Sequence, residues 1–213
     1  MTTKLELYNG ALRICGERPT TLTESREPRR LLDSVWDNQG VDACLENGQW
    51  KFAMRSVKLD FDTDFTKDFG YNRQFTKPSD WVLTSSVCSD EYFSQPLTQY
   101  SDEAGQWYAE IDTIYVRYVS NDSAYGTDYA RWPGTFVDYV SAAFAHKIIF
   151  KLTKEQSKRD EVKKTMEQYL SLAKNKDAFN GPPLFPPAGS FVRSRSRLNS
   201  DQQDRGNRGS LLG

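Results

Sequence analysis

The chain has 213 residues and a net charge of −1, a length that suffices for one sizeable domain or two small ones. Its three cysteines, Cys15, Cys44 and Cys88, are far apart and form no C-x-x-C pair, so the sequence predicts neither a zinc site nor a disulfide framework. No segment has the apolar length of a signal-peptide core or a bilayer span, so we expect a soluble protein of a reducing cytoplasm without a membrane segment.

Two helices are expected in the first 47 residues. A stripe of apolar residues at intervals of three and four begins at Leu5 and ends at Cys15, and Gly16 can end this helix in a left-handed cap. A second helix is expected over 25–47, with a proline in its first turn. Gly40 weakens that second helix by about 1 kcal/mol.

The hydrophobic period changes to two in the middle of the chain. Val57, Leu59 and Phe61 alternate with charged residues, which is typical of a half-buried strand. Residues 71–83 contain two extended segments separated by Pro78.

A further strand is expected near residue 115. Ile114, Val116 and Tyr118 lie on one face of it, and 101–105 has the composition of a hairpin turn before it. The intervening stretch 84–106 is polar and rich in turn residues. The middle of the chain is therefore predicted to be antiparallel β.

Helix returns after residue 133. The first of two helices has a broad apolar stripe, wide enough for packing on more than one side, that includes Phe136, Val140, Phe144, Ile148 and Leu152. Thr153 and Gln156 are expected to form a capping box that starts the second helix. The buried face of that helix is predicted to hold Val162, Met166, Tyr169, Leu170 and Ala173.

These elements predict an α+β fold class. Residues 1–54 and 130–180 form a bundle of about four helices, 55–129 form an inserted antiparallel β region, and 181–213 form an extended arm. The arm contains four prolines followed by arginines, serines and glycines, and alone it buries too little apolar surface to offset its ordering entropy. We expect it to be disordered until it binds a partner.

The arm is basic and the rest of the chain is acidic. From residue 190 onward the net charge is +3, which leaves −4 for the remainder. In an extended segment, arginines that alternate with serines would all point to one side. They would bind carboxylates in a groove of a protein or the phosphates of a nucleic acid, or they are solvated. The candidate binding residues of the arm are Phe191, Arg193, Arg195, Arg197, Arg205 and Arg208.

No catalytic, metal-binding or cofactor-binding residues are predicted, and no enzyme activity is expected. Asp60, Asp62 and Asp64 resemble the opening of a calcium loop, but the glycine and glutamate that such a loop needs are missing, and a solvated strand face explains them better. The only histidine, His146, has no nucleophile motif with it, and the paired carboxylates of 90–91 and 102–103 lie in turn-like contexts.

The five tryptophans fall near element boundaries. Trp36 and Trp50 are expected in the core. Trp107 and Trp132 either seal the junction between helices and sheet or anchor a subunit or tail interface, and the sequence favours neither.

Several landmarks resemble the tail tubular protein A group, the head-to-tail adaptor (connector) proteins of short-tailed bacteriophages. The N-terminal helix pair carries Asn9, Ala11, Leu12, Gly16, Glu17, the step Thr21–Leu22, Trp50, Phe52 and Ala53. The segment FGYNRQFTKPSDWVLTSS is similar to the family's aromatic–Pro–x–Asp–strand segment, and TIYVRYVSN with TFVDYVSAAFAHKIIFKLT is similar to its last strand and long helix. The similarity covers about 1–180, with little to match in 84–106.

The resemblance implies a structural protein of the virion, at the head-tail junction. Such adaptors form a ring of twelve copies beneath the portal protein, extend the DNA channel, and give a platform for the tail nozzle (a tail tubular protein B-like protein) or other tail proteins. Genome DNA passes through without sequence-specific binding, and C-terminal arms reach onto the portal. An arm of 33 residues spans at most about 110 Å. The alternatives are a nucleic-acid-binding module that uses the arm, or a hydrolase.

Overall fold

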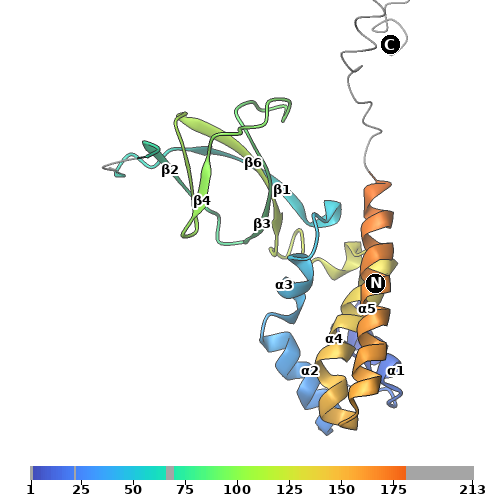
Figure 1. Ribbon diagram of the computed structural model, residues 1–213. Helices are drawn as coiled ribbons and strands as arrows, with labels where there is room; N and C mark the ends of the chain where they lie inside the picture. Colours follow the sequence, from blue (N-terminus) through green and yellow to red (C-terminus); the bar gives the residue numbers. More distant parts are fainter. Residues whose placement is uncertain (1, 22, 66–69, 181–213) are drawn as a thin grey trace, which may run out of the picture. The chain divides into compact units, whose positions relative to one another are not determined.

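The computed structural model describes residues 2–21, 23–65 and 70–180, and its fold is α+β (Figure 1). A compact unit spans Met1–Asn180, so it ends where the sequence predicts that the arm begins. The strands lie between α3 (Gly40–Leu45) and α4 (Gly134–Thr153) in the chain, which is the predicted order of helices, inserted β region and helices.

The first helix agrees with the prediction. α1 spans Lys4–Cys15 and ends at Gly16, which has the predicted left-handed conformation with φ 76°. The structure adds a capping box at the start of α1, in which Thr3 and Glu6 satisfy each other's backbone N–H groups.

The single helix predicted over 25–47 is wrong, because two helices occupy this range. α2 spans Glu27–Asp37 and α3 spans Gly40–Leu45. Gln39 between them is left-handed, with φ 55°. A Cβ on Gly40 would lie 2.5 Å from the carbonyl oxygen of Val35, so only glycine allows this close approach of α3 to the end of α2.

Two three-stranded antiparallel sheets follow the short helix η1 (Lys51–Ala53). The first sheet has the order β1-β6-β3, and the second has the order β2-β5-β4. The strands are β1 (Met54–Asp60), β2 (Arg73–Thr76), β3 (Trp81–Cys88), β4 (Ser101–Glu103), β5 (Gln106–Ala109) and β6 (Thr113–Ser120).

The predicted inner face of β6 is confirmed, since Ile114, Val116 and Tyr118 are fully buried. They share one core with Phe75 of β2 and Trp107 of β5, so the two sheets pack face to face. The hairpin predicted at 101–105 forms, but it joins β4 to β5 rather than leading into β6. The stretch described as polar and turn-rich therefore contains most of β3 and all of β4.

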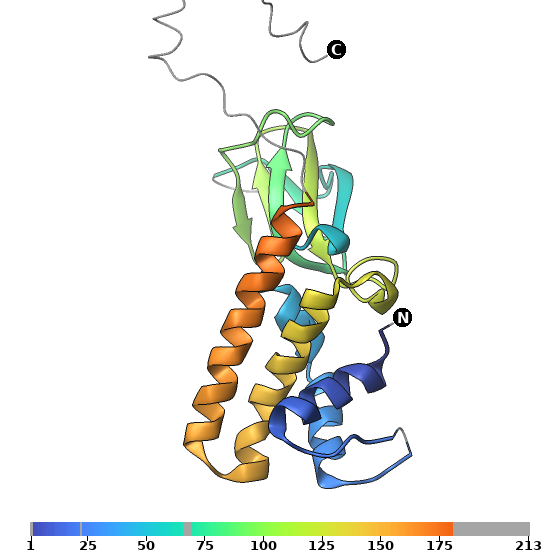
Figure 2. The same cartoon turned by 90° about the vertical axis from the view of Figure 1, so that its right-hand side faces the viewer.

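The last two helices form an antiparallel hairpin. After the short helix η2 (Tyr129–Arg131), α4 spans Gly134–Thr153 and α5 spans Gln156–Ala178. Figures 1 and 2 show α4 and α5 side by side. The predicted capping box at the start of α5 is wrong, because the Thr153 hydroxyl instead donates to the carbonyl of Ile149 within α4.

The core of the helical part surrounds α4, which buries ten of its twenty residues. α1, α2, α3 and α5 all pack against it. Val119 of β6 joins this same core. The Trp50 and Phe136 rings, 4.7 Å apart, pack where the chain leaves the first helices for β1.

Candidate functional site

The outer face of α5 is a large uncovered helical surface. α5 has 23 residues, of which only Val162, Ala173 and Asp177 are buried. Met166, Tyr169 and Leu170 are partly buried against the helical core, so the predicted inner stripe of this helix is confirmed. The remaining faces are polar, and α5 packs mainly along α4.

Two large apolar side chains interrupt this polar surface. Leu172 is 55% exposed and Phe179 is 85% exposed. Their spacing of i and i+7 places them on one face of the helix, with Lys176 exposed between them. Both side chains are free to contact another molecule, although the lysine between them separates their apolar surfaces.

The end of α5 is fastened to the start of the β region. Both carboxylate oxygens of Asp177 accept the backbone N–H of Lys51, at 3.1 and 3.2 Å. The Lys51 ammonium in turn donates to the carbonyl of Ala178 at 3.0 Å. Burial raises the pKa of Asp177, although these contacts with Lys51 oppose the shift. The last described turn of the chain is therefore held in a defined position.

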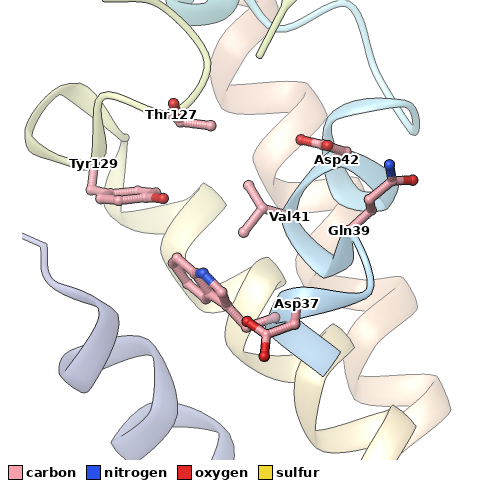
Figure 3. Close-up of a pocket in the computed structure, with 7 residues that line it drawn as sticks. Asp37, Gln39, Val41, Asp42, Thr127 and Tyr129 are labelled. Atoms are coloured by element: carbon pink, nitrogen blue, oxygen red, sulfur yellow. The ribbon is translucent and has the colours of Figure 1, made fainter. Parts of the chain in front are cut away.

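A pocket of about 200 Å³ lies between the α2–α3 corner and the loop before α4. It is lined by Trp36, Asp37, Gln39, Val41, Asp42, Thr127 and Tyr129. Figure 3 shows Tyr129 and Thr127 on one side and Val41 and Asp42 on the other, with Gln39 pointing away. The ring centroids of Trp36 and Tyr129 are 5.6 Å apart, at an interplanar angle of 57°.

The charged groups that line this pocket are all acidic. Asp42 accepts one hydrogen bond, of 3.3 Å, from the Asn121 amide. Burial and then the negative charge of Asp42 raise the pKa of Tyr129, so the field of this carboxylate reaches the phenol. The pocket therefore combines aromatic and acidic groups.

A second polar cluster surrounds Asp80, in the Pro–Ser–Asp segment before β3. Its carboxylate accepts from Arg55 at 2.8 Å, from the Tyr118 hydroxyl at 3.1 Å, and from the Ser120 hydroxyl. These hydrogen bonds outweigh burial and hold the pKa of Asp80 below its usual value of 3.8. The cluster ties β1, β6 and the start of β3 together, so its role is structural.

The structure explains the aspartate run at the end of β1 as cross-strand contacts. Asp60 accepts from Thr113 and Asp62 accepts from Thr76, each at 2.7 Å, while Asp64 is exposed. Among the described residues, no three His, Cys, Asp or Glu side chains are grouped in a way that would hold a metal ion.

The other titratable candidates are also separate from one another. His146 is half-buried on α4, and burial together with the charges of Arg159 and Lys163 lowers its pKa below 6.5. Asp90 accepts three hydrogen bonds from Ser94 and Gln95, which is the pattern of a turn cap.

Trp107 and Trp132 both lie in the interior of the chain. Trp107 is fully buried, and its indole N–H contacts Thr84 and Asp102. Trp132 is 6% exposed and donates to the carbonyl of Gly126 at 2.8 Å. The interface hypothesis for these two indoles is therefore corrected: they pack inside the fold and leave almost no side-chain surface for a neighbouring subunit.

The candidate arm residues, from Phe191 to Arg208, lie outside the described residues. Sequence reasoning missed the Trp36–Tyr129 pocket and the exposure of Leu172 and Phe179. The signal for the latter was present, since Leu172 and Phe179 fall outside the apolar stripe of α5.

No protein-family model matches the chain, and no curated protein matches it significantly. In the described ranges, no helix combines the length and the apolar character that a bilayer crossing requires.

Proposed function

We propose that this chain is a structural virion protein, a head-to-tail adaptor that assembles as a ring between the portal and the tail. In this role it extends the channel for genome DNA and gives a platform for the tail nozzle or other tail proteins. Twelve copies, the number implied by the family resemblance, would form the ring.

The observation that carries the proposal is the uncovered face of α5. A helix of 23 residues that buries three of them has most of its surface free for another protein. Leu172, near the C-terminal end of α5, and Phe179, its C-cap residue, add two exposed apolar side chains to that surface, with the exposed Lys176 between them. A second copy could cover these exposed apolar side chains, and side-by-side packing of such helices is a means to build a ring.

Three of the residues that carry the family resemblance have structural roles in this fold. Asn9 accepts the backbone N–H of Thr20 at 2.8 Å and so fixes the loop after α1. Gly16 provides the left-handed cap of that helix. Asp80 organises three strands. The resemblance therefore rests on residues that determine the fold.

Residues 181–213 are proposed to bind the portal, through Phe191 and the arginines of the segment. Arginine forms bidentate hydrogen bonds with carboxylates, so an acidic groove is the expected receptor. Several arms held on one ring would bind with strong avidity even where each arm binds weakly.

The test is the mass of the complex formed with the portal ring of the same virion, measured by light scattering after size-exclusion chromatography. A discrete complex that contains about twelve added copies is expected. Absence of any association, with the protein folded, would contradict the adaptor function.

Deletion of 181–213 should abolish portal attachment and leave the fold intact. If the truncated chain bound the portal with unchanged affinity, the arm hypothesis would be wrong.

A paired variant tests the α5 surface separately. Leu172→Ser with Phe179→Ser should prevent ring closure on the portal without loss of helicity, since both side chains are exposed. Tyr92→Ser is the matched control, because Tyr92 is 82% exposed and lies in the β region. Equal copy numbers for the two variants would exclude this face of α5 from the contact between copies.

A further inference from the structure

We propose that the pocket between the α2–α3 corner and the loop before α4 is a binding site for one arginine side chain of a partner protein. The inference stands on the pocket itself and does not depend on the adaptor function.

The size of the pocket limits what it can hold. Sites for cofactors and drug-sized ligands have volumes of about 300–1,000 Å³. The volume here is about 200 Å³, which suits a single long side chain rather than a nucleotide or a metabolite of similar size. The occupant is therefore expected to be part of a larger molecule.

The charge of the pocket selects a cation. Asp37 and Asp42 line it, and no lysine or arginine is among the lining residues. The ammonium of Lys4 stands 4.8 Å from the ring centroid of Trp36 and also pairs with Asp33 at 3.5 Å. The indole of Trp36 thus already attracts a cation within the chain.

The shape of the lining favours arginine over lysine. A guanidinium group is planar, stacks on aromatic rings and forms hydrogen bonds with carboxylates through its edge. Tyr129 and Trp36 supply rings that are tilted by 57° to each other. Val41 supplies an apolar contact for the methylene stem, and Asp42 faces the space from α3 (Figure 3). The single amide contact of Asp42 leaves acceptor capacity on its oxygens.

The test uses the full chain, labelled with ¹⁵N, and the probe Nα-acetyl-L-argininamide at constant ionic strength. The indole N–H signal of Trp36 is identified from its loss in Trp36→Phe. A saturable shift of that signal is expected, with a Kd of about 1–10 mM, as befits a ligand of this size. The citrulline analogue, which is neutral and nearly isosteric, should give no saturable shift, and the lysine analogue should bind at least about threefold more weakly.

Asp42→Asn should weaken binding of the arginine probe about tenfold, since the amide retains the shape and removes the charge. Asp64→Asn is the control, because Asp64 is an exposed carboxylate that does not line the pocket. The proposal is overturned if the unaltered chain shows no saturable shift, or if the citrulline or lysine analogue binds as well as arginine. Equal weakening by the two variants would also overturn it. The comparison of analogues on the unaltered chain decides the question even if Asp42→Asn fails to fold.

Discussion

The carboxylate of Asp177, in the last turn of α5, accepts the backbone N–H of Lys51 with both oxygens, at 3.1 and 3.2 Å. This contact joins the end of the helical hairpin to the point where the chain enters the β region. Asp177 is 8% exposed, so its removal leaves a partly buried N–H without a partner. Asp177→Ala is expected to lower the free energy of unfolding by about 1–2 kcal/mol, measured by urea denaturation.

Asp177→Asn tests separately whether the charge of Asp177 contributes to stability. Because burial raises the pKa of Asp177 above 3.8, its ionised form costs stability at neutral pH. Asparagine keeps an oxygen for the Lys51 N–H and carries no charge, so its unfolding free energy should equal or slightly exceed that of the unaltered chain at pH 7. A loss as large as that of the alanine variant would show that the charge itself is required.

The hydrogen bonds of the Asp80 cluster predict that the stability of the fold depends on pH. Asp80→Asn should lower the unfolding free energy by about 2 kcal/mol at pH 7, because hydrogen bonds to a charged carboxylate are replaced by weaker ones. The folded-state pKa of Asp80 is lowered, so its stabilising contribution is complete above the unfolded pKa of 3.8 and is lost as pH falls through the lower folded value.

Denaturant unfolding at pH 7, 4 and 3 measures this contribution. The difference between the unaltered chain and Asp80→Asn should shrink as pH falls below 4. Asp64→Asn, at an exposed carboxylate, serves as the control and should change the unfolding free energy by less than about 0.5 kcal/mol. A difference that stays constant down to pH 3 would assign the effect of Asp80→Asn to packing instead of charge.

The sequence predicted the elements that have strong local periodicity. The inner face of β6 and the buried side of α5 follow from spacing alone, because each repeats at the period of its strand or helix. In α1 the spacing identified Tyr8 and Leu12, but Leu7 and Ala11 are buried as well. The α+β class follows from the order of these elements.

Features set by contacts across the chain could not be predicted in this way. The break at Gln39 depends on the approach of Gly40 to Val35, which spacing cannot reveal. The pocket requires Trp36 and Tyr129 to meet from distant parts of the sequence. The sequence did not distinguish a core position from an interface position for Trp107 and Trp132, because a single sequence does not show what covers an aromatic residue at an element boundary.

Two glycines with opposite surroundings test the account of the α2–α3 corner. A Cβ on Gly40 would meet the Val35 carbonyl at 2.5 Å and the Phe144 ring at 3.1 Å. Gly40→Ala is therefore expected to destabilise the fold by about 2 kcal/mol or more. Gly134→Ala, at a position with open space around it, should stabilise by about 0.5 kcal/mol. Thermal unfolding compares them, and a neutral Gly40→Ala would contradict the close approach at this corner.

His146 predicts a loss of stability in mild acid. Its folded-state pKa is lowered by burial and by the charges of Arg159 and Lys163, so the unfolded chain takes up the proton first. Stability is therefore retained above an unfolded pKa of about 6.5 and declines as pH falls from there toward the lower folded value. His146→Gln removes this contribution, so its unfolding free energy should fall less between pH 7.5 and pH 5.5 than that of the unaltered chain. Identical declines for the two proteins, measured by urea denaturation, would show that His146 is protonated as readily in the folded state as in the unfolded one.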